Sequence, residues 1–226
     1  MIPSSDIIIR NDTPFRFIER PPSQAGANAP LLVMLHGRAA KAETIFTVQG
    51  HFDPAVNVIS IQGPYPCPRG EFEWFLPYDY SRPLESFTEE HFRETEDKLT
   101  VFIQELMDER KTSSANLFLL GFSQGAAMCH ILSLRGKLKP RGVIPMSGFF
   151  PRPILGWNNI STMSSYLITH GTEDEVLPES ESIFAHEYLL SKGISSQYYT
   201  YKGRHKMTIP LLKHTNDWII EQTHNG

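Results

Sequence analysis

Short runs of mostly apolar residues recur along the chain, and between them lie longer stretches whose apolar positions are three and four residues apart. The runs are typical of strands buried on both faces of a parallel sheet, and the longer stretches are typical of amphipathic helices. Strands are expected at Leu31–Leu35, Asn57–Ile61, Asn116–Leu120, Gly142–Met146, Tyr166–Thr169 and Gln197–Tyr201. Helices are expected at Thr88–Arg110, Gln124–Arg135, Pro178–Lys192 and Pro210–Glu221. Because the two alternate, the pattern predicts an α/β fold with a mainly parallel sheet and helices on both of its faces.

Two segments depart from this alternation. Asp6–Arg10 and Phe15–Arg20 flank a turn-forming Asn-Asp-Thr-Pro sequence, which predicts an N-terminal hairpin. Gly63–Glu85 contains five prolines among six aromatic residues, so we expect no regular element there. A long loop in a compact domain often contacts a ligand. The alternative is a loop that packs on the surface without one.

Composition limits the classes of function. The 226 residues carry a net charge of −4 and no basic run, so we expect no nucleic-acid partner and no attraction to an anionic membrane. Neither a signal peptide nor a membrane-spanning run is present, so we expect no membrane insertion. Cys67 and Cys129 have no redox or metal-ligand spacing, which favours free thiols in the cytoplasm. The alternative is a single disulfide between them. No metal or cofactor motif appears. The length suits one domain, residues 1–226, and leaves open whether the chain forms a homo-oligomer.

The clearest candidate for chemistry is the pentapeptide Gly121-Phe122-Ser123-Gln124-Gly125. It matches the pattern G-x-S-x-G and lies between an expected strand and an expected helix, as a nucleophile elbow does. The glycines permit the sharp, strained turn, and the start of the helix favours developing negative charge. The motif predicts Ser123 as the nucleophile of a hydrolase. The alternative is a glycine-rich turn whose serine only caps the helix.

A serine hydroxyl needs a base to remove its proton, and the base needs an acid to orient it. Of the nine histidines, His205 follows the last expected strand and precedes the last expected helix. The chain order of this fold, serine then acid then histidine, puts the acid between the two. The loop after the expected strand Tyr166–Thr169 supplies Glu173, Asp174 and Glu175. Spacing alone does not choose among these three carboxylates.

Acyl transfer also requires two backbone N–H donors for the oxyanion. One belongs to the residue after the nucleophile, here Gln124. The segment Leu35-His36-Gly37-Arg38 follows an early strand and fits the second donor, since glycine permits a sharp turn. We expect His36 to shape this loop rather than to take part in the reaction.

Together these segments resemble the carboxylesterase/phospholipase family of the α/β-hydrolases, which includes the acyl-protein thioesterases. The resemblance covers nearly the whole chain and rests on LLVMLHG (31–37), NLFLLGFSQGAAM (116–128), GVIPMSGFFP (142–151), THGTEDEVLP (169–178) and YKGRH (201–205). It implies the α/β-hydrolase fold. It also implies that Asp174 is the acid, that His205 is the base, and that the amides of Arg38 and Gln124 are the oxyanion donors.

One departure from the family bears on substrate preference. The family usually has a small or apolar residue where this chain has Arg38. We expect Arg38 to place positive charge at the rim of a short pocket, with Trp74 and Phe75 as its aromatic wall. The alternative roles are a surface charge and packing aromatics.

The expected reaction is hydrolysis of carboxylic esters, or by the same chemistry thioesters, of small soluble substrates through an acyl-enzyme. The competing interpretations are a non-catalytic binding module with the same fold and a hydrolase of small peptides.

Overall fold

The computed structural model describes residues 7–24, 28–75, 87–157, 160 and 163–224. The strands of its main sheet are β1 (Ile8–Arg10), β2 (Phe17–Arg20), β3 (Leu31–Leu35), β4 (Asn57–Ile61), β7 (Leu117–Phe122), β8 (Gly142–Met146), β9 (Ser165–Gly171) and β10 (Ser196–Tyr201). The helices are α1 (Ala42–Phe46), α2 (Arg93–Glu109), α3 (Gln124–Leu134), α4 (Ser180–Ser191) and α5 (Ile209–His224). Short 3-10 turns lie at Gln49–His51, Glu89–His91, Ser114–Asn116 and Arg152–Gly156.

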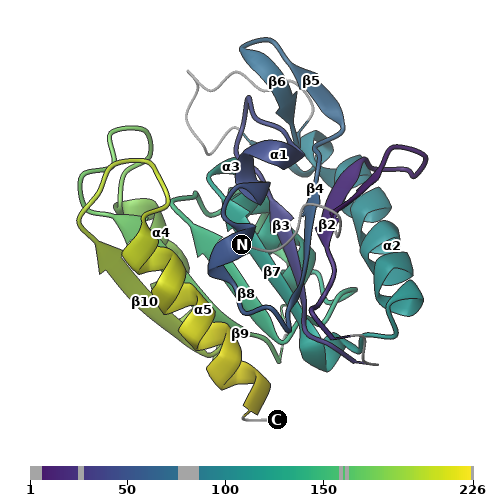
Figure 1. Ribbon diagram of the computed structural model, residues 1–226. Helices are drawn as coiled ribbons and strands as arrows, with labels where there is room; N and C mark the ends of the chain where they lie inside the picture. The colour runs from purple at the N-terminus through teal and green to yellow at the C-terminus, as the bar shows by residue number, and fades with distance from the viewer. Residues whose placement is uncertain (1–6, 25–27, 76–86, 158–159, 161–162, 225–226) are drawn as a thin grey trace.

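The sheet has the strand order β1-β2-β4-β3-β7-β8-β9-β10 (Figure 1). β1 and β2 form an antiparallel hairpin, and β2 pairs antiparallel with β4. All later neighbours are parallel. The carboxyl ends of β3, β7, β9 and β10 therefore meet at one edge, which is where ligands bind in open α/β sheets.

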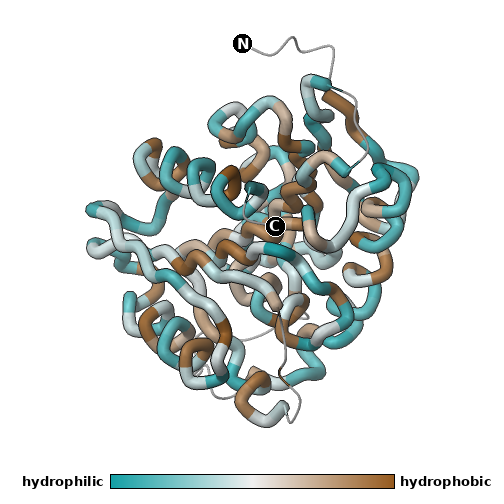
Figure 2. Tube along the Cα trace, turned by 90° about the horizontal axis from the view of Figure 1, so that it is seen from below, coloured by the Kyte–Doolittle hydropathy of each residue, from teal (hydrophilic) through white to brown (hydrophobic). Residues whose placement is uncertain are grey.

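The sheet is covered on both faces, and alternate residues of β3 show how. Leu31, Val33 and Leu35 belong to the core cluster that contains the apolar side chains of α2, α3 and α4. Leu32 and Met34 belong to a second cluster with those of α1 and α5. Figure 2 shows the hydrophilic segments concentrated at the periphery, with helices on either side of the strands. None of the described helices is both long and apolar enough to cross a membrane.

The predicted fold class is confirmed. The strands expected at Leu31–Leu35, Asn57–Ile61 and Gly142–Met146 have those bounds. The N-terminal hairpin is present too, although Asp6 of its first expected strand lies outside the described residues. The first long helix begins at Arg93 and not at Thr88, because the backbone leaves helical geometry at Phe92, whose φ is −130° and ψ −12°.

The expectation of no regular element in Gly63–Glu85 is wrong for its first part. β5 (Tyr65–Cys67) and β6 (Gly70–Glu73) pair as an antiparallel hairpin. The register shifts between Pro66 and Cys67, and a proline is tolerated at such a bulge because it removes no regular ladder hydrogen bond. The short helix α1 was also not expected, since five residues are too few to show a helical period.

Candidate active site

Ser123 occupies a strained turn between β7 and α3. Its φ is 54° and its ψ −114°, a combination that costs a residue with a side chain about 1–3 kcal/mol. The flanking glycines allow the strand, the helix and β3 to approach closely. A Cβ on Gly121 would lie 2.2 Å from the carbonyl oxygen of Gly125, and one on Gly125 would lie 2.2 Å from that of Leu35. The local structure is therefore that of a nucleophile elbow.

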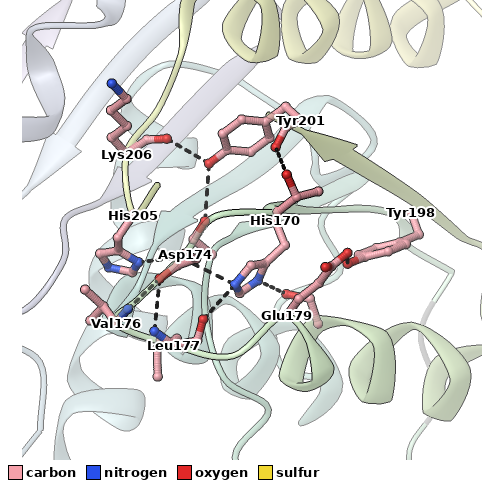
Figure 3. A network of polar contacts seen from close by, with 12 residues as sticks. His170, Asp174, Val176, Leu177, Glu179, Tyr198, Tyr201, His205 and Lys206 are labelled. Carbon is pink, nitrogen blue, oxygen red and sulfur yellow. Dashed lines mark hydrogen bonds and ion pairs between the residues drawn. The ribbon is translucent and has the colours of Figure 1, made fainter. Parts of the chain in front are cut away.

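Asp174 and His205 come from the loops that follow the neighbouring strands β9 and β10. The N–H of Glu173 donates to the carbonyl of Gly203 at 2.9 Å, which ties the two loops together. The Nδ1 atom of His205 lies 2.7 Å from Oδ2 of Asp174 (Figure 3). The carboxylate side chain is 1% exposed and the imidazole 16%, so the pair is shielded on the acid side and accessible on the base side.

Backbone donors hold the Asp174 carboxylate in place and keep it ionised. Its Oδ1 accepts N–H groups from Val176 at 2.9 Å and Leu177 at 3.0 Å. Burial by itself raises the pKa of Asp174, but the bonds from Leu177, His205 and Val176 outweigh it, and the pKa is lowered overall. Because an ionised carboxylate only accepts hydrogen bonds, Nδ1 of His205 carries a proton. In the neutral imidazole the lone pair is then on Nε2.

The geometry separates the three carboxylates that spacing alone did not. Glu173 and Glu175 have side chains that are 51% and 72% exposed, and they lie 4.0 Å from Lys202 and 3.7 Å from Arg204 respectively. Among the described residues, Asp174 is the carboxylate that contacts His205.

Sequence reasoning missed a second histidine behind the acid. His170, fully buried at the end of β9, places Nε2 3.4 Å from Oδ2 of Asp174 and 3.0 Å from the carbonyl of Leu177. Its Nδ1 lies 2.7 Å from the hydroxyl of Ser182. The His170 ring thus connects the acid loop to helix α4. Its place at the end of a strand, directly before the acid loop, was the available signal.

Ser123 and His205 line the same pocket, whose volume is about 300 Å³. The imidazole of His205 also packs against the ring of Phe122, with 4.7 Å between centroids. The remaining lining residues come from the loop after β3, from α1 and from the loop after β10. They are His36, Gly37, Arg38, Ala40, Thr44, Ile45, Lys206 and Met207.

Trp74 and Phe75 are not in this lining, in contrast to the predicted aromatic wall. Both are fully buried in the core. The hairpin β5–β6 directs Trp74 inward, where its indole N–H donates to the carbonyl of His36 at 2.7 Å. Arg38 does line the pocket, but its Nε donates to the buried carboxylate of Glu73 at 3.2 Å. The charge of Arg38 is therefore compensated beside the pocket.

His36 shapes the loop that follows β3. Its Nε2 accepts the backbone N–H of Gly63 at 2.8 Å, so the ring proton lies on Nδ1, which is 2.6 Å from the carbonyl of Gly37 and donates to it. The side chain is fully buried, and burial lowers its pKa to about 4. The ring is thus neutral and structural at ordinary pH.

Two buried neutral histidines should make stability depend on pH. Burial lowers the pKa of His36 to about 4 and that of His130, in α3, to about 3, from an ordinary 6.5. The unfolded chain takes up these protons below pH 6.5 and the folded chain does not. Their contribution is therefore complete above pH 6.5 and is lost as the pH falls toward 4 and 3. Each residue should contribute a slope of up to about 1.4 kcal/mol per pH unit.

Urea unfolding between about pH 7 and about pH 5 measures this slope. His130→Gln should reduce it by about half, while the change of the exposed His224 to Gln should leave it unaltered. An unfolding free energy that is flat over this interval would contradict the prediction.

Comparison with known proteins identifies the group to which this fold and site belong. A model of the phospholipase/carboxylesterase family matches residues 18–220. The chain belongs to the phospholipase/carboxylesterase family. The family resemblance recognised in the sequence is thereby confirmed, and this family is one of serine hydrolases, the class of enzyme expected from the sequence.

Individual relatives of this phospholipase/carboxylesterase family member agree with that placement. Acyl-protein thioesterase 1 homolog 1 from Dictyostelium discoideum is 28% identical over 112 residues, which are 49% of this chain and 50% of the relative. The match thus spans about half the length of that curated relative. The crystal structure of esterase PE8 has a TM-score of 0.80 at 24% identity, covering 90% of this chain and 96% of the other. A carboxylesterase from Mesorhizobium loti has a TM-score of 0.77 at 18% identity, covering 95% and 99%. The two structures support the fold.

Proposed function

We propose that this family member is a serine esterase with Ser123 as nucleophile, His205 as general base and Asp174 as the acid that orients the base. The observation that carries the proposal is the 2.7 Å contact between His205 and Asp174 in a pocket that Ser123 also lines. The strained backbone of Ser123 supports it, because such strain persists where function requires it.

The proposed reaction proceeds through an acyl-enzyme. Nε2 of His205 takes the hydroxyl proton as Oγ of Ser123 bonds to the ester carbonyl carbon, and the backbone amides of Arg38 and Gln124 stabilise the oxyanion. The imidazolium then returns the proton to the departing alcohol as the carbon–oxygen bond breaks. In the second half, a water donates a proton to Nε2 as its oxygen bonds to the acyl carbon. The imidazolium then returns that proton to Oγ of Ser123 as the bond between Oγ and the acyl carbon breaks, which releases the acid and the free serine.

The pocket favours small substrates. Its volume of about 300 Å³ is at the lower end of the range of ligand sites, and Ile45, Phe122 and Met207 supply apolar surface suited to a short acyl or alcohol chain. We include thioesters in the proposal, since the attack is the same and a relative is named as an acyl-protein thioesterase. We further propose a cytoplasmic location, because Cys67 and Cys129 are both buried free thiols.

The proposal is tested by labelling with a fluorophosphonate and by hydrolysis of p-nitrophenyl esters of increasing acyl length. We expect one equivalent of label per chain and the highest kcat/KM for the shortest esters. A non-catalytic binding module with this fold would take up no label. A peptidase would be labelled, but it would cleave small peptides faster than activated esters.

Met207 offers a test of the pocket itself. Its half-buried side chain lines the wall near His205, so Met207→Ala should enlarge the site and shift the preference toward longer acyl chains. One methylene contact is worth about 1 kcal/mol, so we expect the ratio of kcat/KM between longer and shorter esters to rise about fivefold to tenfold. The control is Met163→Ala, because Met163 is 95% exposed and is not among the residues that line the pocket. An unchanged ratio would place the acyl chain outside this pocket.

A further inference from the structure

The end of β6 runs alongside the loop that follows β3 and contacts every second residue of that loop. Phe72 and Ala40 exchange two backbone hydrogen bonds, of 3.0 and 3.4 Å. One residue further on, the buried carboxylate of Glu73 accepts a hydrogen bond from Nε of Arg38 at 3.2 Å. Both contacts hold the segment that carries one proposed oxyanion donor, the backbone amide of Arg38.

Trp74 continues this run of contacts and extends it to the helix that carries the other proposed donor. Its indole N–H donates to the carbonyl of His36 at 2.7 Å, and its backbone N–H donates to Oε1 of Gln124, also at 2.7 Å. Trp74 and Gln124 are both buried. One residue thereby connects the loop after β3 with the start of α3.

The backbone around these contacts is packed closely. A Cβ on Gly63 would lie 2.6 Å from the carbonyl oxygen of Glu73, and a Cβ on Gly125 would lie 2.7 Å from that of His36. The ring of His36 also packs against the indole of Trp74, with 5.0 Å between centroids. With so little free space, the hydrogen bonds of Glu73 and Trp74 set where the loop and the helix start lie relative to each other.

We propose that Glu73 and Trp74 are positioning residues, which hold the amides of Arg38 and Gln124 at the separation at which both reach one oxyanion. This inference rests on the proposed function, because acyl transfer through Ser123 is the step that needs both donors at once. Hydrogen bonds to an oxyanion strengthen as its charge develops, so a misplaced donor affects the transition state more than substrate binding. Neither positioning residue contacts the substrate in this scheme.

Trp74→Phe is the central test, since it keeps a buried ring and removes the donor to His36. We expect kcat to fall about tenfold to a hundredfold with KM nearly unchanged. Affinity for a trifluoromethyl ketone, whose adduct with Ser123 carries an oxyanion, should fall by a similar factor. The matched control is Trp218→Phe: Trp218 is a buried indole of α5, packed on Phe118 in the other core cluster. The Trp218→Phe variant should retain wild-type kcat and KM.

A pair of changes at Glu73 keeps the test decisive if Trp74→Phe unfolds at the assay temperature. Glu73→Leu should lower kcat, and Glu73→Gln, which retains an acceptor oxygen for Arg38, should recover most of the loss. A raised KM with unchanged kcat, or inhibitor affinity unaffected by the loss of activity, would overturn the positioning role. So would wild-type kinetics in both Trp74→Phe and Glu73→Leu. A wild-type protein that hydrolyses no ester or thioester would overturn the proposed function first, and this inference with it.

Discussion

Replacing Ser123 with alanine should lower kcat for ester hydrolysis by about 10⁴-fold to 10⁶-fold, with the fold unchanged. The variant keeps the pocket and the backbone donors, so a small residual rate above the uncatalysed reaction is expected. It loses the oxygen that forms the acyl-enzyme. Steady-state rates on a short p-nitrophenyl ester, together with intact-mass analysis after fluorophosphonate treatment, measure both effects.

Ser133→Ala is the matched control for this change. Ser133 is a buried serine of α3, the helix that follows Ser123, and its hydroxyl lies 2.5 Å from that of Tyr166, in the core. We expect the Ser133→Ala variant to react with the fluorophosphonate at the wild-type rate. Full activity in purified Ser123→Ala would rule out Ser123 as the nucleophile.

Asp174→Asn should lower kcat by about 10⁴-fold, because it should hold His205 in the tautomer that cannot act as the base. The backbone N–H groups of Val176 and Leu177 bind Oδ1, so the amide oxygen of the new asparagine should take that place. Its NH₂ group then faces Nδ1 of His205. An NH₂ donor requires Nδ1 to accept, which moves the imidazole proton to Nε2 and removes the lone pair that should receive the serine proton.

The neighbouring carboxylates provide the controls for Asp174→Asn. Glu173→Gln and Glu175→Gln alter exposed side chains, and exposed charges of this kind contribute little. We expect both variants to keep wild-type kcat. If Glu173→Gln were the variant that lost activity, the assignment of the acid would be wrong.

The sequence predicted the sheet better than the segments that pack above its carboxyl edge. β3, β4 and β8 are buried along their whole length and so appear as mostly apolar runs with clear limits. β5 and β6 depend on a bulge beside Pro66 and on pairing with each other, and no periodicity in the sequence records that. Element type follows from local pattern, whereas a short irregular hairpin depends on the partner that it meets.

In the candidate site, too, the features with a local sequence signal were predicted and those set by tertiary contacts were not. Motif and chain order indicated Ser123 and His205. Spacing alone left Asp174 level with its acidic neighbours, and the family resemblance selected it. The folded loops show the physical basis of that choice, because they place Asp174 2.7 Å from His205. The aromatic residues of the hairpin were expected at the pocket because they follow a strand that ends at the correct edge. The direction of the Trp74 side chain depends on hydrogen bonds to His36 and Gln124, which come from segments remote in sequence. Such tertiary contacts have no local signal.

The backbone strain at Ser123 has a consequence for engineering this protein. Glycine adopts a positive φ without the steric cost that a side chain brings, and this residue holds φ at 54°. A screen that selects only for resistance to heat would therefore favour Ser123→Gly. This variant would be more stable but would lack the proposed nucleophile. Thermostabilised versions are best sought with position 123 held fixed and with turnover, rather than survival of the fold, as the selected property.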